Sequence, residues 1–285
     1  MTQILITGST GMLGTQLCHV LKKYELIGIS RKENRDLDKQ YNFDLCDIGK
    51  INNQYLNISP DVIIHTAANV NLKNCESNKD LTYKLHVAAT QKLVYTFPNA
   101  KFIYISTDSV FDGTEKTYNE NSIPNPLNYY AYSKLIGEKK VLEFSKNPLV
   151  IRTNIIGENQ NKNSFSDWII GELNRGNKLS GYSNIYFNPI HVKILAEIIS
   201  NLIKRKLGHK ILNIGSIEKI SKFDYMKMLS NLLGFNSELI VEKKIKIFND
   251  KIMRPFNTFL DTSLLSSYVQ NDFPINESLN KFILK

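Results

Sequence analysis

The sequence predicts an α/β fold in which a doubly wound parallel sheet of the Rossmann type is followed by a smaller, mixed α/β lobe. Short apolar runs alternate with helical stretches over residues 1–150, and the runs are continuously apolar, which is typical of strands buried on both faces. A glycine-rich turn, GSTGMLG at 8–14, follows the first run directly. Together these observations favour a parallel sheet that is covered by helices on both sides.

The expected strands of the first half are apolar runs bounded by polar or glycine-containing turns. They are QILITG from residue 3, ELIGIS from 25, YNFDL from 41, PDVIIHTAA from 60, KFIYIST from 101 and NPLVIRTNI from 147. Helical spacing of apolar residues predicts helices at 12–24, at about 80–97 and at 135–144.

The pattern loosens beyond about residue 155, where we expect the smaller lobe. Helices are predicted at 163–176, 193–205 and 221–234, the last with a Ser221 N-cap and a Gly234 stop, and short strands at 185–192 and 209–215. We expect residues 1–155 to form a dinucleotide-binding domain and 156–285 to form mainly a substrate-binding lobe. The boundary is approximate, because the chain is expected to weave between the two parts.

Composition excludes several classes of function. The 285 residues carry a formal charge of +9, but the charges form no dense block, so we expect an anionic small substrate rather than nucleic acid. No apolar run approaches the ~20 residues that span a bilayer, and the start is not a signal peptide. Three widely spaced cysteines without CxxC, and five histidines without HxxxH or HExxH, predict no metal site. We therefore expect a soluble, cytoplasmic protein.

The glycine turn predicts a dinucleotide-binding loop. Gly8, Gly11 and Gly14 form a GxxGxxG pattern between the first strand and an amphipathic helix. The first glycine permits a tight turn, the second lets a pyrophosphate approach the backbone, and the third lets helix and strand pack closely. The other residues that we expect to line the cofactor here are Thr10, Met12 and Leu13.

The end of the second expected strand bears on the choice of cofactor. GIS is followed by Arg31 and Lys32, where an NAD-binding site usually has an acidic residue. Basic residues there favour NADPH, with NADH still possible, and Ser30 belongs to the same group; the alternative is that Arg31 is only an exposed charge. Asp44 and Leu45 end the next short strand, where an adenine ring could lie.

The stretch YYAYSK at 129–134 suggests a proton donor. Tyr130 and Lys134 are four residues apart and share one face of a helix, whereas Tyr129 and Tyr132 are poorly aligned with the lysine. A nearby cation lowers the pKa of a tyrosine, which otherwise lies near ~10. The tyrosine can then give a proton to a carbonyl oxygen, and Thr107 or Ser106 at the end of the KFIYIST strand can hold that oxygen.

These residues carry a resemblance to a known family. GxxGxxG at the start, STDSVFDG at 106–113 and NPLNYYAYSKLIGE at 125–138 closely resemble the extended short-chain dehydrogenase/reductases, and more narrowly the dTDP-4-dehydrorhamnose reductase (RmlD-like) branch. Further matching pieces are HTAANVNLKNCE at 65–76, FNPIHVKILAEII at 187–199, ISKFDYM at 220–226 and RPFNTFLD at 254–261. The resemblance covers essentially the whole chain.

The resemblance implies roles for particular residues. Thr107 corresponds to the hydroxyl that holds the substrate carbonyl, Tyr130 to the catalytic acid, and Lys134 to its partner, which also contacts the nicotinamide ribose. Ala67 and Ala68 correspond to a stretch that lines the cofactor.

Three departures from the branch are visible. Ala131 replaces its usual glycine, Lys73 replaces a frequent aspartate, and no tryptophan stands near Ile155. The missing tryptophan counts against dTDP-rhamnose as the product.

Other candidates have open alternatives. Asn154 could reach a substrate phosphate or cap a turn, and Arg254 could pair with a diphosphate or with a surface acid. Ser109 and Phe111 are expected as pocket walls, although Phe111 could simply be buried. We expect Trp168 to be a core residue rather than a ligand.

The expected function is NADPH-dependent reduction of a nucleotide-linked 4-keto-6-deoxy sugar in surface-polysaccharide synthesis. A non-catalytic, NADP-binding regulatory subunit, similar to the β subunit of methionine adenosyltransferase, is the rival from another class, and a nucleotide-sugar epimerase is a further alternative. A homodimer is possible. The nucleotide, the sugar and the product stereochemistry stay open, since such folds host many activities.

Overall fold

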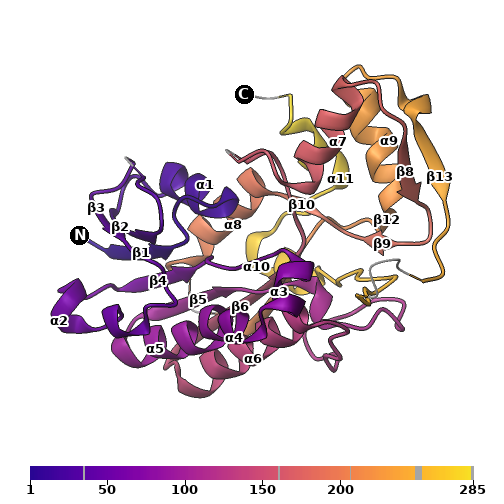
Figure 1. Cartoon of the computed structure of the whole chain (residues 1–285). Coiled ribbons are helices and arrows are strands. Elements are labelled where there is room, and N and C mark those ends of the chain that lie inside the picture. The colour runs from indigo at the N-terminus through magenta and orange to yellow at the C-terminus, as the bar shows by residue number, and fades with distance from the viewer. Residues whose placement is uncertain (35, 160, 206, 248–251, 284–285) are drawn as a thin grey trace.

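A seven-stranded parallel sheet forms the centre of the protein in the computed structural model, which describes residues 1–34, 36–159, 161–205, 207–247 and 252–283 (Figure 1). The strand order is β11-β6-β5-β4-β1-β2-β3, so the chain reverses direction across the sheet between β1 and β4. In such sheets the crevice at this reversal, beyond the carboxyl ends of the strands, is where ligands bind. The strands are β1 Gln3–Thr7, β2 Glu25–Ser30, β3 Lys39–Asn42, β4 Val62–His65, β5 Lys101–Ile105, β6 Asn147–Thr153 and β11 Ile211–Ile214.

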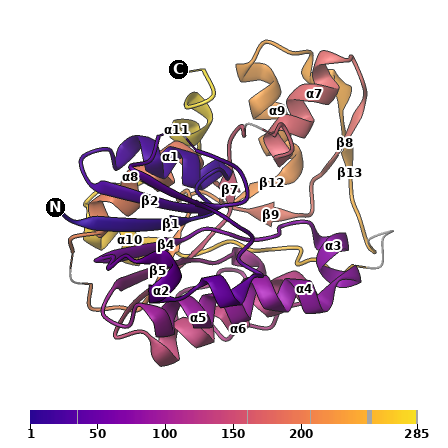
Figure 2. The same ribbon diagram turned by 60° about the vertical axis from the view of Figure 1, so that its left-hand side comes forward.

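Helices cover both faces of this sheet, as continuously apolar strands require (Figure 2). Strand residues alternate between two cores: Ile4 and Ile6 face one, and Leu5 between them faces the other. The first face is covered by α1 Met12–Val20, α8 Val192–Leu202 and α10 Ser263–Val269, and the second mainly by α2 Asn53–Leu56, α5 Ala89–Thr96 and α6 Tyr129–Phe144.

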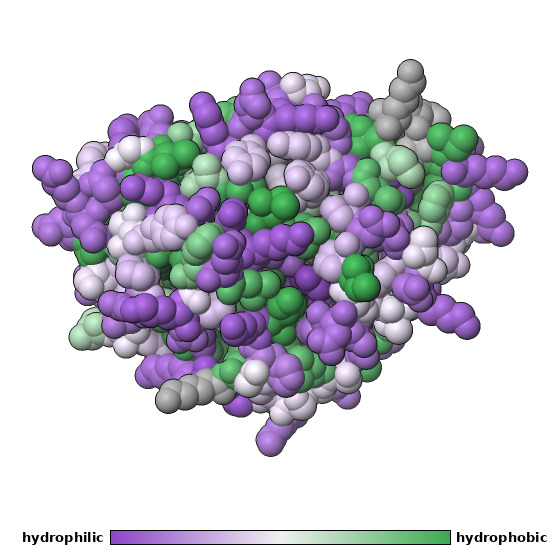
Figure 3. All heavy atoms as spheres, turned by 90° about the horizontal axis from the view of Figure 1, so that it is seen from below, coloured by the Kyte–Doolittle hydropathy of each residue, from purple (hydrophilic) through white to green (hydrophobic). Residues whose placement is uncertain are grey.

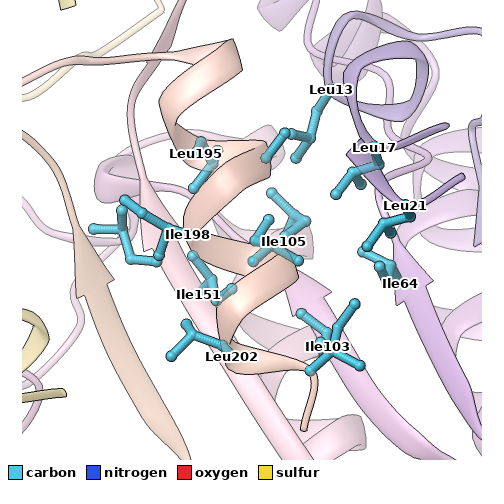
Figure 4. Close-up of a cluster of buried hydrophobic side chains, with 14 of the residues drawn as sticks. Leu13, Leu17, Leu21, Ile64, Ile103, Ile105, Ile151, Leu195, Ile198 and Leu202 are labelled. Atoms are coloured by element: carbon cyan, nitrogen blue, oxygen red, sulfur yellow. The ribbon is translucent and has the colours of Figure 1, made fainter. Parts of the chain in front are cut away.

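The first core joins segments that lie far apart in the sequence. Figure 4 shows leucine and isoleucine side chains of α1, α8 and the neighbouring strands gathered in one cluster. The labelled side chains are Leu13, Leu17, Leu21, Ile64, Ile103, Ile105, Ile151, Leu195, Ile198 and Leu202. Helix α8, from the second half of the sequence, therefore packs with α1 on the main sheet.

The helix expected at 80–97 is not uniform. Helix α4 Lys79–Tyr83 and helix α5 are joined by a π-helical turn, Lys84–Ala88, and α3 Leu72–Ser77 precedes them. Single π-helical turns inside α-helices occur frequently at functional sites. This turn carries His86, which packs beside α6.

The structure corrects two details of the sequence prediction. The third strand covers Lys39–Asn42 rather than 41–45; it is an edge strand with a partly exposed, polar sequence, and the apolar Phe43 and Leu45 enter the core after it ends. The run at 209–215 was expected in the smaller lobe, but β11 pairs with β6 in the main sheet, a long-range pairing that periodicity does not reveal. A division at residue 155 therefore stays an approximate proposal.

The smaller lobe has its own core. Figure 1 shows α7 and α9 beside the strands β8 and β13, away from the main sheet. Buried apolar residues of these elements and of α11 pack together there. The elements are α7 Phe165–Asn174, α9 Lys222–Leu232, α11 Ile275–Asn280 and the paired strands β8 Leu179–Tyr182 with β13 Ile240–Lys243, β9 Tyr186–Phe187 with β12 Ile220–Ser221, and β7 Ile155–Ile156 with β10 Ile190–His191. Short 3₁₀ turns cover Ile48–Lys50, Asp108–Val110 and Ser237–Leu239.

Charged and polar side chains are spread over the surface. The face seen from below is mostly hydrophilic, with apolar side chains in smaller groups (Figure 3). None of the helices in the described part of the chain has both the length and the apolar character needed to cross a bilayer.

Candidate functional site

The glycine loop has the geometry that a bound pyrophosphate requires. Gly8 has a φ of +71°, and a Cβ there would lie 2.9 Å from the backbone of Ala67 at the end of β4. A Cβ on Gly14 would overlap the Gly8 carbonyl oxygen, so both positions need glycine. Gly11 caps α1 without any side-chain hydrogen bond to the first turn. The N–H groups of that turn are thus open to an anion, which fits a dinucleotide.

The other expected cofactor residues surround this loop in part. The Gly8 N–H donates to Ile29 O at 2.7 Å, which places the loop beside the end of β2, where Arg31 and Lys32 are exposed. The Ser30 side chain is not directed to solvent; its hydroxyl donates to Lys32 O and accepts a hydrogen bond from Gln40.

The remaining cofactor candidates divide between surface and core. Ala67, Ala68, Thr10 and Met12 are half-buried around the loop, whereas Leu13 and Leu45 belong to the cores. Asp44 is half-buried, and its carboxylate accepts the Cys46 N–H at 2.9 Å.

Helix α6 brings the expected tyrosine and lysine together. Asn128 caps the helix by accepting the Ala131 N–H at 3.0 Å, which is why the helix begins immediately before Tyr130. Lys134 is buried one turn further along the helix, and its ammonium donates to Ile105 O at 2.6 Å, at the end of β5. Thr107 follows the same strand and is also buried.

The two titratable groups are shifted by burial. Burial raises the pKa of Tyr130, and the Thr107 side chain opposes this shift as a hydrogen-bonding partner. Burial lowers the pKa of Lys134 to about 7, although the Glu138 carboxylate opposes it. The expectation that Lys134 depresses the pKa of Tyr130 is wrong for this structure: the ammonium binds Ile105 O and lies 4.0 Å from the Tyr104 ring centroid, so desolvation dominates at Tyr130.

A carboxylate next to Thr107 gathers the surrounding polar groups. Asp108 accepts hydrogen bonds from the Thr107 and Ser109 hydroxyls at 3.1 and 3.2 Å. It also accepts the Asn154 amide at 2.7 Å and the Thr258 hydroxyl at 2.5 Å. Three segments of the chain, around residues 108, 154 and 258, therefore meet at one buried acid, which fixes the position of the Thr107 hydroxyl.

A histidine supports Tyr130 from behind. His86 Nε2 accepts the Asn69 N–H at 2.9 Å, so the ring proton belongs on Nδ1 and is donated to the Ser133 hydroxyl at 2.7 Å. The Ser133 hydroxyl in turn donates to Tyr130 O at 2.8 Å, and the two rings meet edge to face. Burial lowers the pKa of His86 to about 3, so the ring stays neutral and keeps this orientation.

An ion pair lies under the site. The Glu138 carboxylate accepts hydrogen bonds from Arg152 Nε and Nη2 at 3.2 and 2.8 Å, and from the Ser106 hydroxyl at 2.5 Å. The carboxylate and the guanidinium are 1% and 3% exposed. The hydroxyl of Ser106, the alternative to Thr107, thus binds Glu138, whereas the Thr107 side chain is the hydrogen-bonding partner of Tyr130.

The substrate candidates fare differently. Ser109 and Asn154 lie at the site, bound to Asp108. Phe111 is 0% exposed and stacks on Tyr118 with centroids 4.2 Å apart, so it is a core residue and not a pocket wall. Arg254 is half-buried and donates to Ile252 O at 3.2 Å.

The expectation for Trp168 is wrong. Its side chain is 45% exposed and stacks on Phe165 at 6.0 Å, because it lies on the outward side of α7.

Sequence reasoning missed three residues near the site: His86, Thr258 and Lys222. Thr258 follows Asp108 by 150 positions, and no spacing pattern connects them. The signal that was available was indirect, since Thr258 and Lys222 lie within the family-like stretches RPFNTFLD and ISKFDYM.

Fold and site together define an extended short-chain dehydrogenase/reductase-like protein, with a glycine loop after β1 and a threonine, tyrosine and lysine beyond the carboxyl end of β5. The model of the family described as "RmlD substrate binding domain" matches residues 1–284, and the chain belongs to that family. Within the described residues no group of histidines, cysteines and acids could hold a metal ion.

Solved structures of relatives share the fold. A hypothetical dTDP-4-dehydrorhamnose reductase from Sulfolobus tokodaii is 30% identical, with a TM-score of 0.85 over 96% of this chain and 97% of that one. The dTDP-4-dehydrorhamnose reductase from Bacillus anthracis, solved in complex with NADP, has the same fold at 24% identity and TM-score 0.85, covering 100% and 99% of the two chains.

Sequence relatives have more varied names. Methionine adenosyltransferase 2 subunit beta from Xenopus laevis is 33% identical over 210 residues, which is 71% of this chain and 62% of that protein. The alignment thus spans less than two thirds of that relative's length. The spore coat polysaccharide biosynthesis protein SpsK of Bacillus subtilis is 28% identical over 213 residues, covering 73% of this chain and 72% of that protein.

Proposed function

We propose that this protein is an NADPH-dependent reductase of a nucleotide-linked 4-keto-6-deoxy sugar, acting in the synthesis of a surface polysaccharide. The observation that carries the proposal is the arrangement of Thr107, Tyr130 and Lys134 beside an open helix N-terminus. Membership of the RmlD family supports it. NADPH, when bound, supplies the hydride that the carbonyl carbon receives.

The protein residues supply the proton and the orientation. The Thr107 hydroxyl is held by Asp108 and positions the carbonyl oxygen next to Tyr130. Because burial raises the pKa of Tyr130, the phenol is protonated at neutral pH and can give its proton to that oxygen. Lys134 has a pKa near 7, and its protonated ammonium can stabilise the negative charge of the phenolate as that charge forms. The product gains one hydrogen on carbon and one on oxygen.

The cofactor proposal rests on the residues around the glycine loop. Gly8, Gly11 and Gly14 leave room for the pyrophosphate, and the exposed Arg31 and Lys32 would hold a 2′-phosphate. NADPH is therefore proposed over NADH. We also propose a homodimer and a cytoplasmic location, both from the sequence alone.

The test is turnover. The purified protein is mixed with NADPH or NADH and a panel of dTDP-, UDP- and GDP-linked 4-keto-6-deoxy sugars, and loss of the reduced nicotinamide absorbance is followed. We expect oxidation with one sugar and loss of at least about 100-fold in kcat for Tyr130→Phe. Tyr132→Phe, on the same turn but 46% exposed, is the control and should keep full activity. Unchanged turnover in Tyr130→Phe would refute the assigned role.

Two alternatives have their own outcomes in this assay. The similarity to methionine adenosyltransferase 2 subunit beta favours a regulatory role as second candidate. In that case NADPH binds, no sugar is reduced, and the protein forms a stoichiometric complex with a catalytic methionine adenosyltransferase subunit. An epimerase would interconvert nucleotide sugars without net loss of NADPH.

A further inference from the structure

A lysine at the start of α9 lies between two aromatic rings of the smaller lobe. The Lys222 ammonium is 3.3 Å from the ring centroid of Phe187 and 4.7 Å from that of Phe165. Ring faces stabilise a cation but accept no ordinary hydrogen bond, so the three N–H donors are left for another partner. Among the described residues Lys222 Nζ has neither a carboxylate within 4.0 Å nor a hydrogen-bond acceptor.

Backbone pairing fixes this lysine next to the candidate site. The Lys222 N–H donates to Ile185 O at 2.8 Å, and β12, immediately before it, pairs with β9, which contains Phe187. The Thr258 N–H donates to Tyr186 O of the same β9 strand at 3.0 Å, while its hydroxyl donates to Asp108. Thr258 thus connects strand β9, which carries Phe187, to Asp108, the acid that holds Thr107.

Asp108 does not satisfy the lysine. Its negative charge is close enough to oppose the lowering of the Lys222 pKa, which burial brings to about 7. However, its two oxygens already accept four hydrogen bonds, from Thr107, Ser109, Asn154 and Thr258, and no ion pair joins it to Lys222. A half-buried ammonium without an oxygen partner is costly, unless a bound molecule supplies one.

We propose that Lys222 is a substrate-binding residue that contacts an anionic oxygen of the diphosphate of the nucleotide sugar. The kind of ligand, a nucleotide sugar, rests on the proposed function. The charge that the lysine recognises follows from its position. The ring faces hold the ammonium while leaving it able to donate to an oxygen entering beside Asp108. The neutral Met would fill the same space without this donor.

The experiment measures both binding and turnover in Lys222→Met and Lys222→Arg. Lys227→Met is the matched control, since Lys227 lies on the same helix over the Phe223 ring but is already paired with Glu238 at 3.0 Å. A charge-assisted hydrogen bond predicts a 10- to 100-fold rise in KM for Lys222→Met, a change in kcat below about threefold, and an unchanged NADPH affinity. Lys222→Arg should recover most of the loss, and Lys227→Met should match the wild type.

Calorimetric titration with dTDP, UDP, UDP-glucose and UDP-glucuronic acid, in the presence of NADP, requires no turnover. If Lys222→Met weakens all four ligands, the lysine contacts the diphosphate, as proposed. If it weakens only UDP-glucuronic acid, the lysine recognises a sugar carboxylate, which a 6-deoxy sugar lacks, and the proposal is overturned. Equal affinities in the wild type and Lys222→Met, or no binding of any of these anions to the wild type, would overturn the proposal. Ligand binding that depends on Lys222 without reduction of any keto sugar would instead refute only the reductase function.

Discussion

Breaking the ion pair beneath the site should destabilise the protein strongly. Glu138→Gln leaves the Arg152 guanidinium, which is only 3% exposed, without a compensating charge. The carboxylate accepts three contacts from Arg152 and one from Ser106, and removing one partner of such a buried pair costs about 3–5 kcal/mol. That is a large fraction of the ~5–15 kcal/mol by which domains are stable.

The measurement is the free energy of unfolding from denaturant titration of wild type and variants. Glu238→Gln is the control: its side chain is 83% exposed and its partner, Lys227, is half-buried, so the cost should stay below about 1 kcal/mol. The double variant Glu138→Leu/Arg152→Met should recover most of the loss, since Arg152 Nη1 already lacks a hydrogen-bond partner in the described structure. A cost below about 1 kcal/mol for Glu138→Gln would refute this reasoning.

Two further predictions concern packing and pH. Gly137→Ala should cost about 1–3 kcal/mol in the same denaturant titration, because its Cβ would overlap the Tyr104 hydroxyl and lie 2.7 Å from His86 O. The control Gly171→Ala, whose Cβ would meet no atom closer than 4.0 Å, should be neutral or slightly stabilising. Equal effects of the two substitutions would contradict the packing argument. Burial lowers the pKa of Lys134 from 10.5 to about 7, so the unfolded chain binds more protons between these values and this lysine makes stability rise with pH. Stability measured from pH 7 to 10 should therefore rise less steeply in Lys134→Met than in the wild type, and parallel curves would rule out the shift.

The sheet could be predicted from the sequence because its strands are buried on both faces, which leaves continuous apolar runs such as KFIYI. Edge strand β3 was displaced in the prediction because one exposed side removes that signal. Strand β11 was assigned to the smaller lobe because pairing partners far apart in sequence leave no local trace. Local periodicity thus predicts which segments form helices and strands more reliably than it predicts which strands pair.

The same distinction applies to the candidate site. Thr107, Tyr130 and Lys134 lie within short motifs, and the structure brings them together around the end of β5. The electrostatics could not be predicted from the sequence. Burial raises the pKa of Tyr130, whereas the nearby Lys134 was expected to lower it. Lys222 was also missed, because only tertiary structure brings it to β9.

The weaving of the chain has a consequence for truncation and for folding during synthesis. A fragment ending at residue 155 would lack α8 and β11, and would expose the apolar face that α8 covers. Asp108 would also lose the Thr258 hydroxyl, so its set of hydrogen bonds is complete only after residue 258 has left the ribosome. The nascent protein therefore depends on segments beyond residue 190 to complete both the first core and the site, and we expect neither half to be stable when expressed alone.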